Sequence, residues 1–294
     1  MNRIDAHHHL WDLGQRDPDW LKEPALQPIR KSYLLDDLVN QTDMLNVDHT
    51  VVVQSVGDID ETFALLEQAE QSGGLIAGVV GWVDLSGDVA DQIDRLQAAD
   101  GGRWLVGIRH QVQDEEDPAW LARPDVLRGL QAVAERGLVY DLLVFPHQLP
   151  AAIHAVRAVT DGRFVLDHAA KPDLRHGDIE QWARDIRELS GNRNVACKLS
   201  GLVTEADWNS WEVEDLRPVA DHALETFGPD RVMVGSDWPV CELAATYRQV
   251  WDAAERLVAK QDIAQVFADT ATRWYGLQLV SIGQSSDVNV GTNS

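Results

Sequence analysis

The sequence predicts an α/β fold, namely a single (β/α)₈ TIM barrel with a closed sheet of eight parallel strands. Eight short apolar runs rich in β-branched residues alternate with longer segments of helical period, and their starts are roughly 25 to 45 residues apart. The strands are apolar enough to be covered on both faces, as a parallel sheet requires. An open doubly wound sheet would usually carry a glycine-rich loop after its first strand, and HHHLW at residues 7–11 is unlike such a loop.

The expected strands are short apolar runs that end in polar residues. They are Arg3–His9, Thr50–Gln54, Leu75–Val83, Trp104–His110, Leu138–Val144, Arg163–His168, Asn194–Leu199 and Arg231–Ser236. Between them, apolar residues recur at spacings of three and four, as in Val89, Ile93 and Leu96. Such spacing places the side chains on one helical face, which would pack against the sheet.

One domain accounts for almost the entire chain. We assign residues 1–280 to the barrel and expect the tail at 281–294, rich in Ser, Gly, Asn and Gln, to be disordered. Two connections are unusually long, namely Leu10 to Lys31 after the first strand and Gln111 to Pro124 after the fourth. Loops of this length in a compact domain are usually functional. Both follow a strand, so we expect them at the C-terminal face of the barrel, where TIM-barrel enzymes have their active sites.

The composition excludes several classes of partner. The 48 acidic and 25 basic residues give a formal net charge of −23. Such a field repels phosphate backbones and anionic lipid, so we expect no nucleic-acid and no membrane partner. An anionic ligand would need a local basic pocket. Two cysteines, the lack of a signal-peptide stretch and the lack of an apolar run of ~18 residues predict a cytoplasmic protein. Homo-oligomer formation stays open.

Polar residues gather at the ends of the expected strands, which is the strongest functional signal in the sequence. A polar residue in mid-strand is costly, but one at the C-terminal end of a barrel strand faces the site. Nearly every strand ends in a group that can hydrogen-bond or transfer a proton. These residues are His7, His9, Gln54, Trp82, Asp84, Arg109, His110, Asp141, Asp167, His168, Lys198, Ser200, Ser236 and Asp237.

Three histidines and one aspartate are the candidate catalytic residues. His7 and His9 are two residues apart in a strand, so they project to the same face, whereas His8 points the other way. Taken alone, this pair could equally be two histidines of the core whose ring nitrogens are hydrogen-bonded. His168 and Asp237 at two further strand ends favour a functional interpretation, because all four side chains can meet at the mouth of the barrel.

The motifs at these strand ends resemble those of the amidohydrolase superfamily. They are Asp5-Ala-His-His-His-Leu-Trp-Asp, Gly107-Ile-Arg-His, Leu166-Asp-His-Ala-Ala-Lys-Pro, Lys198-Leu-Ser-Gly and Gly235-Ser-Asp-Trp-Pro-Val. The resemblance runs from Asn2 to Leu277, in order and at matching strand ends. Within the superfamily, the chain is similar to the branch of sugar-lactone hydrolases of the L-fuconolactonase and L-rhamnonolactonase type.

The resemblance implies an enzyme of sugar metabolism that hydrolyses a neutral sugar-acid lactone to the open aldonic acid. Asp237 would act as a general base on the water that attacks the ring carbonyl. His7, His9 and His168 would polarise that carbonyl and stabilise the developing oxyanion. The ring size (1,4 or 1,5) and the sugar, with L-fucono- and L-rhamnonolactone among the options, stay open.

The chain departs from the pattern of binuclear amidohydrolases. These enzymes add a bridging lysine or glutamate on the fourth strand and a histidine on the fifth. Here those places hold Arg109-His110 and Asp141, so we do not expect a two-metal centre.

A single divalent ion is compatible with the residues that remain. His7, His9 and Asp237 would hold it, with His168 nearby, and zinc suits imidazole and carboxylate ligands. Some lactonases of this branch work without a metal. We therefore expect either no strictly required cofactor or one zinc ion.

The candidate substrate-binding residues are charged or aromatic side chains beside the strand ends. They are Arg109, Lys198, Asp141, Trp11, Trp82 and Trp238. The two basic residues would bind carbonyl or ring oxygens of the lactone, with an ion pair to Asp141 or Asp167 as the alternative. The tryptophans would form an apolar floor for a sugar ring, with packing in the core as their alternative.

Two other function classes use part of the same pattern. A zinc-dependent decarboxylase, or another amidohydrolase of the superfamily, would act on an unsaturated carboxylic acid or an amide with a similar set of histidines and aspartate. It would require a metal and a strong carboxylate clamp, which the few basic strand ends only partly supply. A non-catalytic binding barrel would not need Asp237 and His168 together.

Overall fold

Eight parallel strands form one sheet in chain order in the computed structural model, which describes residues 2–177 and 179–279. The strands are β1 (Ile4–His8), β2 (His49–Val53), β3 (Ile76–Gly81), β4 (Leu105–His110), β5 (Val139–Leu142), β6 (Arg163–Leu166), β7 (Val195–Leu199) and β8 (Val232–Val234). The sheet closes where His8 pairs with Trp238 in a parallel bridge. The predicted TIM barrel is confirmed, whereas the expected disordered tail at 281–294 lies outside the described residues.

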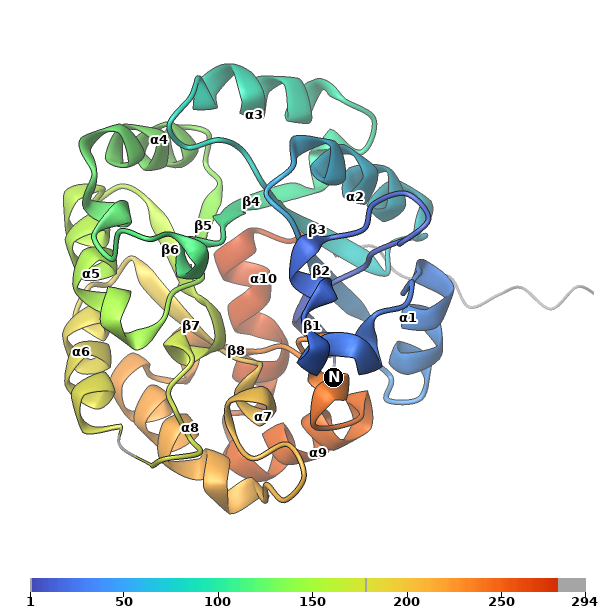
Figure 1. Ribbon diagram of the computed structural model, residues 1–294, viewed down its shortest axis with the longest axis vertical. Helices are drawn as coiled ribbons and strands as arrows, with labels where there is room; N and C mark the ends of the chain where they lie inside the picture. Colours follow the sequence, from blue (N-terminus) through green and yellow to red (C-terminus); the bar gives the residue numbers. More distant parts are fainter. Residues whose placement is uncertain (1, 178, 280–294) are drawn as a thin grey trace, which may run out of the picture.

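Most helices surround the strands in a ring, whereas α10 (Thr270–Tyr275) lies in its middle (Figure 1). The other α-helices are α1 (Leu35–Asp43), α2 (Ile59–Gln71), α3 (Val89–Ala98), α4 (Pro124–Glu135), α5 (Leu149–Ala158), α6 (Glu180–Ser190), α7 (Leu202–Glu205), α8 (Val213–Phe227) and α9 (Tyr247–Leu257). Val89, Ile93 and Leu96 are buried on α3, as their spacing predicts. None of the helices in the described part of the chain is both long and apolar enough to cross a membrane.

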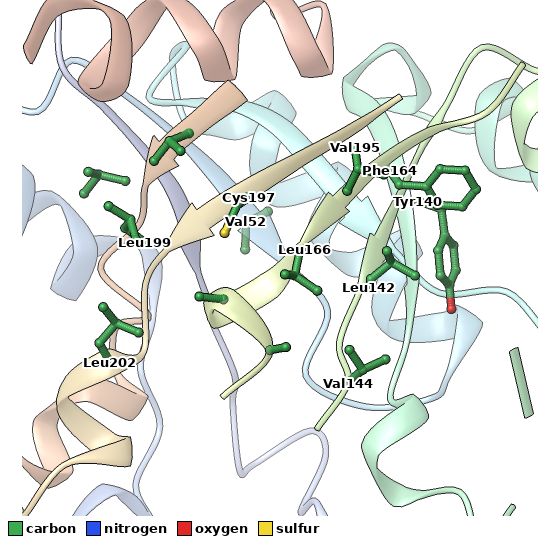
Figure 2. Close-up of a cluster of buried hydrophobic side chains, with 14 of the residues drawn as sticks. Val52, Tyr140, Leu142, Val144, Phe164, Leu166, Val195, Cys197, Leu199 and Leu202 are labelled. Atoms are coloured by element: carbon green, nitrogen blue, oxygen red, sulfur yellow. The ribbon is translucent and has the colours of Figure 1, made fainter. Parts of the chain in front are cut away.

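Two apolar layers hold the barrel together, one on each side of the sheet. The outer layer packs strand side chains such as Leu142, Leu166 and Cys197 against the helices (Figure 2). Cys197 is fully buried there and packs as a small apolar side chain, while its neighbour Lys198 lies fully buried on the other face. Burying apolar area contributes roughly 25 cal/mol per Å², so these layers dominate the stability of the fold.

The inner layer is covered by α10, which lies in the middle of the ring in Figure 1. Trp274 and Tyr275 of this helix pack with strand residues of the barrel interior, among them Val139 and Met233. The helix therefore covers the end of the barrel interior that lies away from the polar strand ends.

Several expected strands are shorter in the structure, for a reason that bears on function. The sixth and eighth end at Leu166 and Val234 rather than at His168 and Ser236. Beyond these points the backbone leaves the extended conformation, and His168 and Asp237 adopt positive φ angles of 53° and 56°. The third strand likewise covers Ile76–Gly81 only.

The long connection after the first strand is ordered. We call residues 9–34 the β1–α1 loop. It contains two short 3₁₀ helices, Asp19–Lys22 and Pro24–Ile29. Its two ends are joined by backbone hydrogen bonds, because Trp11 N donates to Tyr33 O at 3.1 Å and Tyr33 N donates to Trp11 O at 2.8 Å.

Candidate active site

The structure brings the four candidate catalytic residues together at the mouth of the barrel. Nε2 of His7 lies 3.2 Å from Nε2 of His9, which confirms that the two rings share a face. Oδ1 of Asp237 lies 3.4 Å from Nε2 of His9, 3.7 Å from Nε2 of His7 and 4.0 Å from Nε2 of His168. His8 points away and bonds Thr50 instead. Four polar groups from three strand ends thus converge on one point.

Asp5 joins β1 to the segment after β8, which together carry three of the four residues of this cluster, a role that was not expected from the sequence. Its Oδ1 accepts hydrogen bonds from the backbone nitrogens of His7 at 3.2 Å and Ser236 at 2.8 Å. Its Oδ2 accepts from Ser236 Oγ at 2.6 Å and from Tyr247 OH at 3.1 Å. Burial raises the pKa of Asp5 to about 6, although these donors lower it. The Asp-x-His spacing could have pointed to this role of Asp5. The sequence does not show, however, which hydrogen-bond donors face a carboxylate in mid-strand.

Backbone hydrogen bonds between β1 and the segment after β8 fix the position of Asp237. Its backbone nitrogen donates to His7 O at 2.8 Å, and His9 N donates to Trp238 O at 2.7 Å. The close approach of β1 and the segment after β8 requires Gly235, because a Cβ there would stand 2.6 Å from Cβ of His7. The glycine of the Gly-Ser-Asp-Trp-Pro motif is therefore a steric requirement of the site.

His168 belongs to a left-handed turn rather than to a strand. Residues 168–171 all have positive φ, between 48° and 62°. Such angles are unfavourable for residues other than glycine and persist mainly where surrounding contacts impose them, often at functional sites. Nδ1 of His168 lies 2.9 Å from Ser200 Oγ, so the ring is held from β7.

The electrostatics favour an ionised carboxylate among neutral imidazoles. Burial would raise the pKa of Asp237, but His168, His9 and His7 outweigh it and hold this pKa well below its usual value. Burial lowers the pKa of His168 to about 4, although Asp237 and Asp167 raise it. Burial also lowers the pKa of His7 well below its ordinary value. At neutral pH the cluster therefore contains an anionic Asp237 beside uncharged His7 and His168.

A buried ion-pair network lies beneath the cluster. Nζ of Lys198 lies 2.6 Å from Asp141 Oδ2, 3.0 Å from Asp167 Oδ1 and 3.1 Å from His7 Nδ1. Arg109 pairs with Asp167 at 3.1 Å and also donates to Gln54. Ion pairing, the alternative to substrate binding for the two basic residues, is thus observed. Asp141 is held further by Tyr275 OH at 2.8 Å.

A cavity of about 280 Å³ opens above the cluster. Its lining combines the catalytic candidates with polar and apolar residues of the surrounding loops. The lining residues are His9, Trp20, Glu23, Leu26, Ser55, Arg109, Gln111, Gln113, Asp114, Leu143, His168, Lys171, Asp237 and Val240. Both long loops contribute side chains, as their length and position predicted.

The tryptophans chosen from the sequence lie around this cavity rather than in its lining. Trp238 and Trp11 are buried, and their ring nitrogens donate to Glu242 and to Lys31 O. Trp82 donates to His110, which stacks on Trp120 and faces away from Arg109. Trp20 is the aromatic residue of the lining. Sequence alone did not single it out, because it lies in mid-loop and far from any strand end.

The donor set fits a divalent cation. Nδ1 of His9 lies 2.8 Å from the carbonyl oxygen of Val53, so this nitrogen carries the proton and Nε2 presents a lone pair to the cluster. His7, His168 and Asp237 each offer one ligand atom, and these atoms lie within 4.8 Å of one another. Imidazole and carboxylate donors around one point are the ligands that zinc prefers.

Comparisons with known proteins give a family match and several similar relatives. The family model described as amidohydrolase matches residues 4–277. The L-fucono-1,5-lactonase of Burkholderia multivorans is 39% identical over 94% of this chain and 96% of its own length. The L-fucono-1,5-lactonase of Burkholderia ambifaria is 36% identical over 93% and 95%. A crystal structure of a Burkholderia multivorans amidohydrolase with bound zinc has a TM-score of 0.87 and 37% identity, covering 95% of this chain and 100% of that one.

Proposed function

Because this chain belongs to the amidohydrolase family and is a hydrolase, we propose that it opens a neutral sugar-acid lactone to the aldonic acid. The observation that carries the proposal is Asp237, an ionised carboxylate surrounded by three imidazoles at the base of a cavity. The names of the two Burkholderia relatives support a lactone of the L-fucono-1,5 type as substrate. A further relative, the L-rhamnono-gamma-lactonase of Scheffersomyces stipitis, is 24% identical over 48% of this chain, so its five-membered ring is the weaker candidate.

In the proposed reaction, Asp237 removes a proton from water as the water oxygen attacks the ring carbonyl. The carbonyl oxygen becomes an oxyanion, and the rings of His7 and His168 flank the position where this charge develops. The lone pair of His9 Nε2 would instead accept a hydrogen bond from the attacking water or bind a metal ion. The bond from the carbonyl carbon to the ring oxygen then breaks. The proton held by Asp237 passes to the departing alkoxide, which leaves a sugar hydroxyl and a carboxylic acid that ionises.

A single zinc ion would be held by His7, His168 and Asp237, whose ligand atoms lie within 4.8 Å of one another. His9, which the sequence suggested as a ligand in place of His168, lies beside this group, with its Nε2 3.2 Å from Nε2 of His7. When bound, the ion would polarise the carbonyl as a Lewis acid. A lactone is more electrophilic than an amide and has a better leaving group, so we propose that the ion is not strictly required. Asp237 and the imidazoles keep their roles of proton transfer and orientation in either case.

The remaining candidates divide into direct and supporting roles. Arg109 lies in the cavity lining, so we propose that it contacts a substrate oxygen while Asp167 holds it. Lys198 and Asp141 are fully buried and bonded to each other, so we propose that they support His7 from below. Trp20 and Leu143 offer an apolar wall to the sugar ring. Trp11, Trp82 and Trp238 would act from behind this wall.

The test measures the hydrolysis of L-fucono-1,5-lactone. A pH indicator detects the acid that the reaction releases, in assays with and without a chelator. Wild type is expected to release acid in both conditions. Asp237→Asn keeps the size of the side chain but cannot accept the proton, so we expect kcat to fall by a factor of about 10² to 10⁴ with an unchanged melting temperature. A fully active D237N variant would refute the assignment of the base.

The same plate separates the alternatives. A zinc-dependent decarboxylase would leave lactones intact and lose its activity on unsaturated carboxylic acids with chelator. A non-catalytic binding barrel would show no turnover of any lactone, and neither D237N nor a His168 variant would alter that result.

A further inference from the structure

Lys171 lines the cavity, but the proposed reaction leaves it without a role. Its Nζ donates to Gln113 Oε1 at 2.8 Å and lies 5.6 Å from the centre of the Phe145 ring. Within residues 2–177 and 179–279 it forms no ion pair with a carboxylate. Arg109, the other lysine or arginine of the lining, is already paired with Asp167. An ammonium group has three N–H donors, so two remain for a ligand.

The backbone places this ammonium group beside the catalytic cluster. Lys171 ends the left-handed turn that begins at His168, and its backbone nitrogen donates to His168 O at 2.9 Å. The same unfavourable conformation thus aims both side chains at one cavity. Pro172 follows directly and limits the conformations of Lys171 itself.

The charge that the reaction creates has to be accommodated in an acidic environment. Hydrolysis of a neutral lactone produces a carboxylate next to Asp237, and Glu23 and Asp114 also line the cavity. The molecule as a whole carries a formal net charge of −23. Like charges in a site of reduced dielectric repel strongly unless a cation lies between them. No carboxylate in the described part of the chain lies within ion-pair distance of Lys171. Its charge acts on Glu205 only at longer range, where it partly offsets the burial that raises the pKa of Glu205, so the ammonium group keeps donors for an anionic ligand.

We propose that Lys171 is a ligand-binding residue that recognises anionic oxygens, and that it binds the carboxylate of the aldonate product. This inference rests on the proposed function, since it takes the aldonate as the product. The ammonium group donates hydrogen bonds to the carboxylate oxygens while Gln113 holds the side chain. A neutral lactone can accept a hydrogen bond from the same ammonium group but brings no opposite charge to it, so Lys171 discriminates by charge.

Aldonate binding tests this inference independently of turnover. Isothermal titration calorimetry measures the affinity of wild type, Lys171→Met, Lys171→Arg and Lys260→Met for L-fuconate. A hydrogen bond to a charged group is lost in K171M, so we expect binding weaker by about tenfold to a hundredfold. The arginine variant keeps the charge and is expected to retain most of the affinity. The K260M control makes the same change of charge at an exposed residue outside the cavity and is expected to bind as wild type does.

Kinetics on L-fucono-1,5-lactone complete the test. We expect the KM of K171M for the neutral lactone to rise by a smaller factor than its Kd for L-fuconate, because the lactone carries no charge opposite to the ammonium group. Aldonate binding equal to wild type in a folded K171M variant, or no aldonate binding by wild type itself, would overturn the inference. Failure of wild type to hydrolyse any lactone would instead overturn the proposed function, so the two failures are distinguishable.

Discussion

Gly201 lies against two of the side chains that act in the proposed reaction, His168 and Asp237. Its φ is +63°, and a Cβ there would stand 2.6 Å from Nδ1 of His168 and 3.0 Å from Oδ2 of Asp237. A methyl group would have to displace one of these side chains. Gly73 has nearly the same conformation, with φ of +64°, but a Cβ at that position meets no atom within 4 Å. A comparison of the two glycines therefore separates the backbone strain of a Cβ at positive φ from the displacement of His168 or Asp237.

Replacement of each glycine by alanine tests this separation. Both variants place a Cβ in the left-handed region, so each is expected to lose about 1 kcal/mol of stability. Only Gly201→Ala displaces His168 or Asp237, and a displacement near 1 Å can reduce turnover by about 100-fold. We expect that loss in kcat for G201A, measured on the lactone, and wild-type turnover for G73A. Equal activity of the two variants would show that the site tolerates the methyl group.

The loops around the cavity are fastened to one another through a single backbone carbonyl. Ser55 O accepts from Trp20 Nε1 at 3.0 Å and from Gln111 Nε2 at 2.9 Å, which ties the β1–α1 loop to the loop after β4. Glu61, near the start of α2, holds this segment in place. Its carboxylate accepts from Ser55 N at 2.8 Å, from Val56 N at 3.1 Å and from the Ser55 hydroxyl. The cavity wall therefore depends on a buried carboxylate outside it.

Glu61 gives this part of the fold a defined pH dependence. Burial raises the pKa of Glu61 above its ordinary value of 4.5, although the hydrogen bonds from Ser55 and Val56 lower it. The folded protein thus retains this proton to a higher pH than the unfolded chain does. Its contribution to stability is fully present below pH 4.5 and is lost as the pH rises through the raised pKa.

Glu61→Gln keeps the shape of the side chain but cannot titrate. We expect the free energy of unfolding of wild type, relative to E61Q, to decrease as the pH rises from 4.5 toward neutrality. Urea denaturation of both proteins at several pH values measures this difference. A difference that increases over the same range would contradict the raised pKa.

The sequence predicted the elements better than the contacts between them. An apolar run followed by His, Asp or Lys marks a strand end, because the C-terminal ends of barrel strands face the site and carry most such residues. The pairing of Lys198 with Asp141 was open, because it depends on how far each strand is displaced along its neighbour. Trp20 was not predictable either, since its place in the cavity is determined by two 3₁₀ helices without apolar periodicity.

Across the whole molecule, charged groups of the interior link most of the barrel. Lys198 on β7 contacts Asp141 on β5, Asp167 after β6 and His7 on β1. Tyr275 of α10 donates to Asp141 from the opposite end. The floor of the site is thus made of ion pairs that no single βα unit supplies. Removal of one charge leaves the others buried without a partner, which costs more than the pair contributes.

Lys198→Met is therefore expected to destabilise the protein strongly. The side chain is fully buried, so we expect a loss of about 3–5 kcal/mol in the free energy of unfolding, measured by urea denaturation. The double variant K198M/D141N removes one of the stranded carboxylates and is expected to be more stable than K198M. A double variant less stable than K198M would show that the buried charge of Asp141 is not destabilising in the absence of Lys198.

The contact between Tyr275 and Asp141 also has a consequence for biosynthesis. During synthesis, β5 leaves the ribosome before α10. In a growing chain the carboxyl group of Asp141 therefore lacks the hydrogen bond from Tyr275 until α10 follows. The inner apolar layer stays open at one end until Trp274 and Tyr275 emerge from the exit tunnel. The last helix of the described chain is thus the element that completes the floor beneath His7, so a site with this floor requires residue 275 as well as the last of the eight strands.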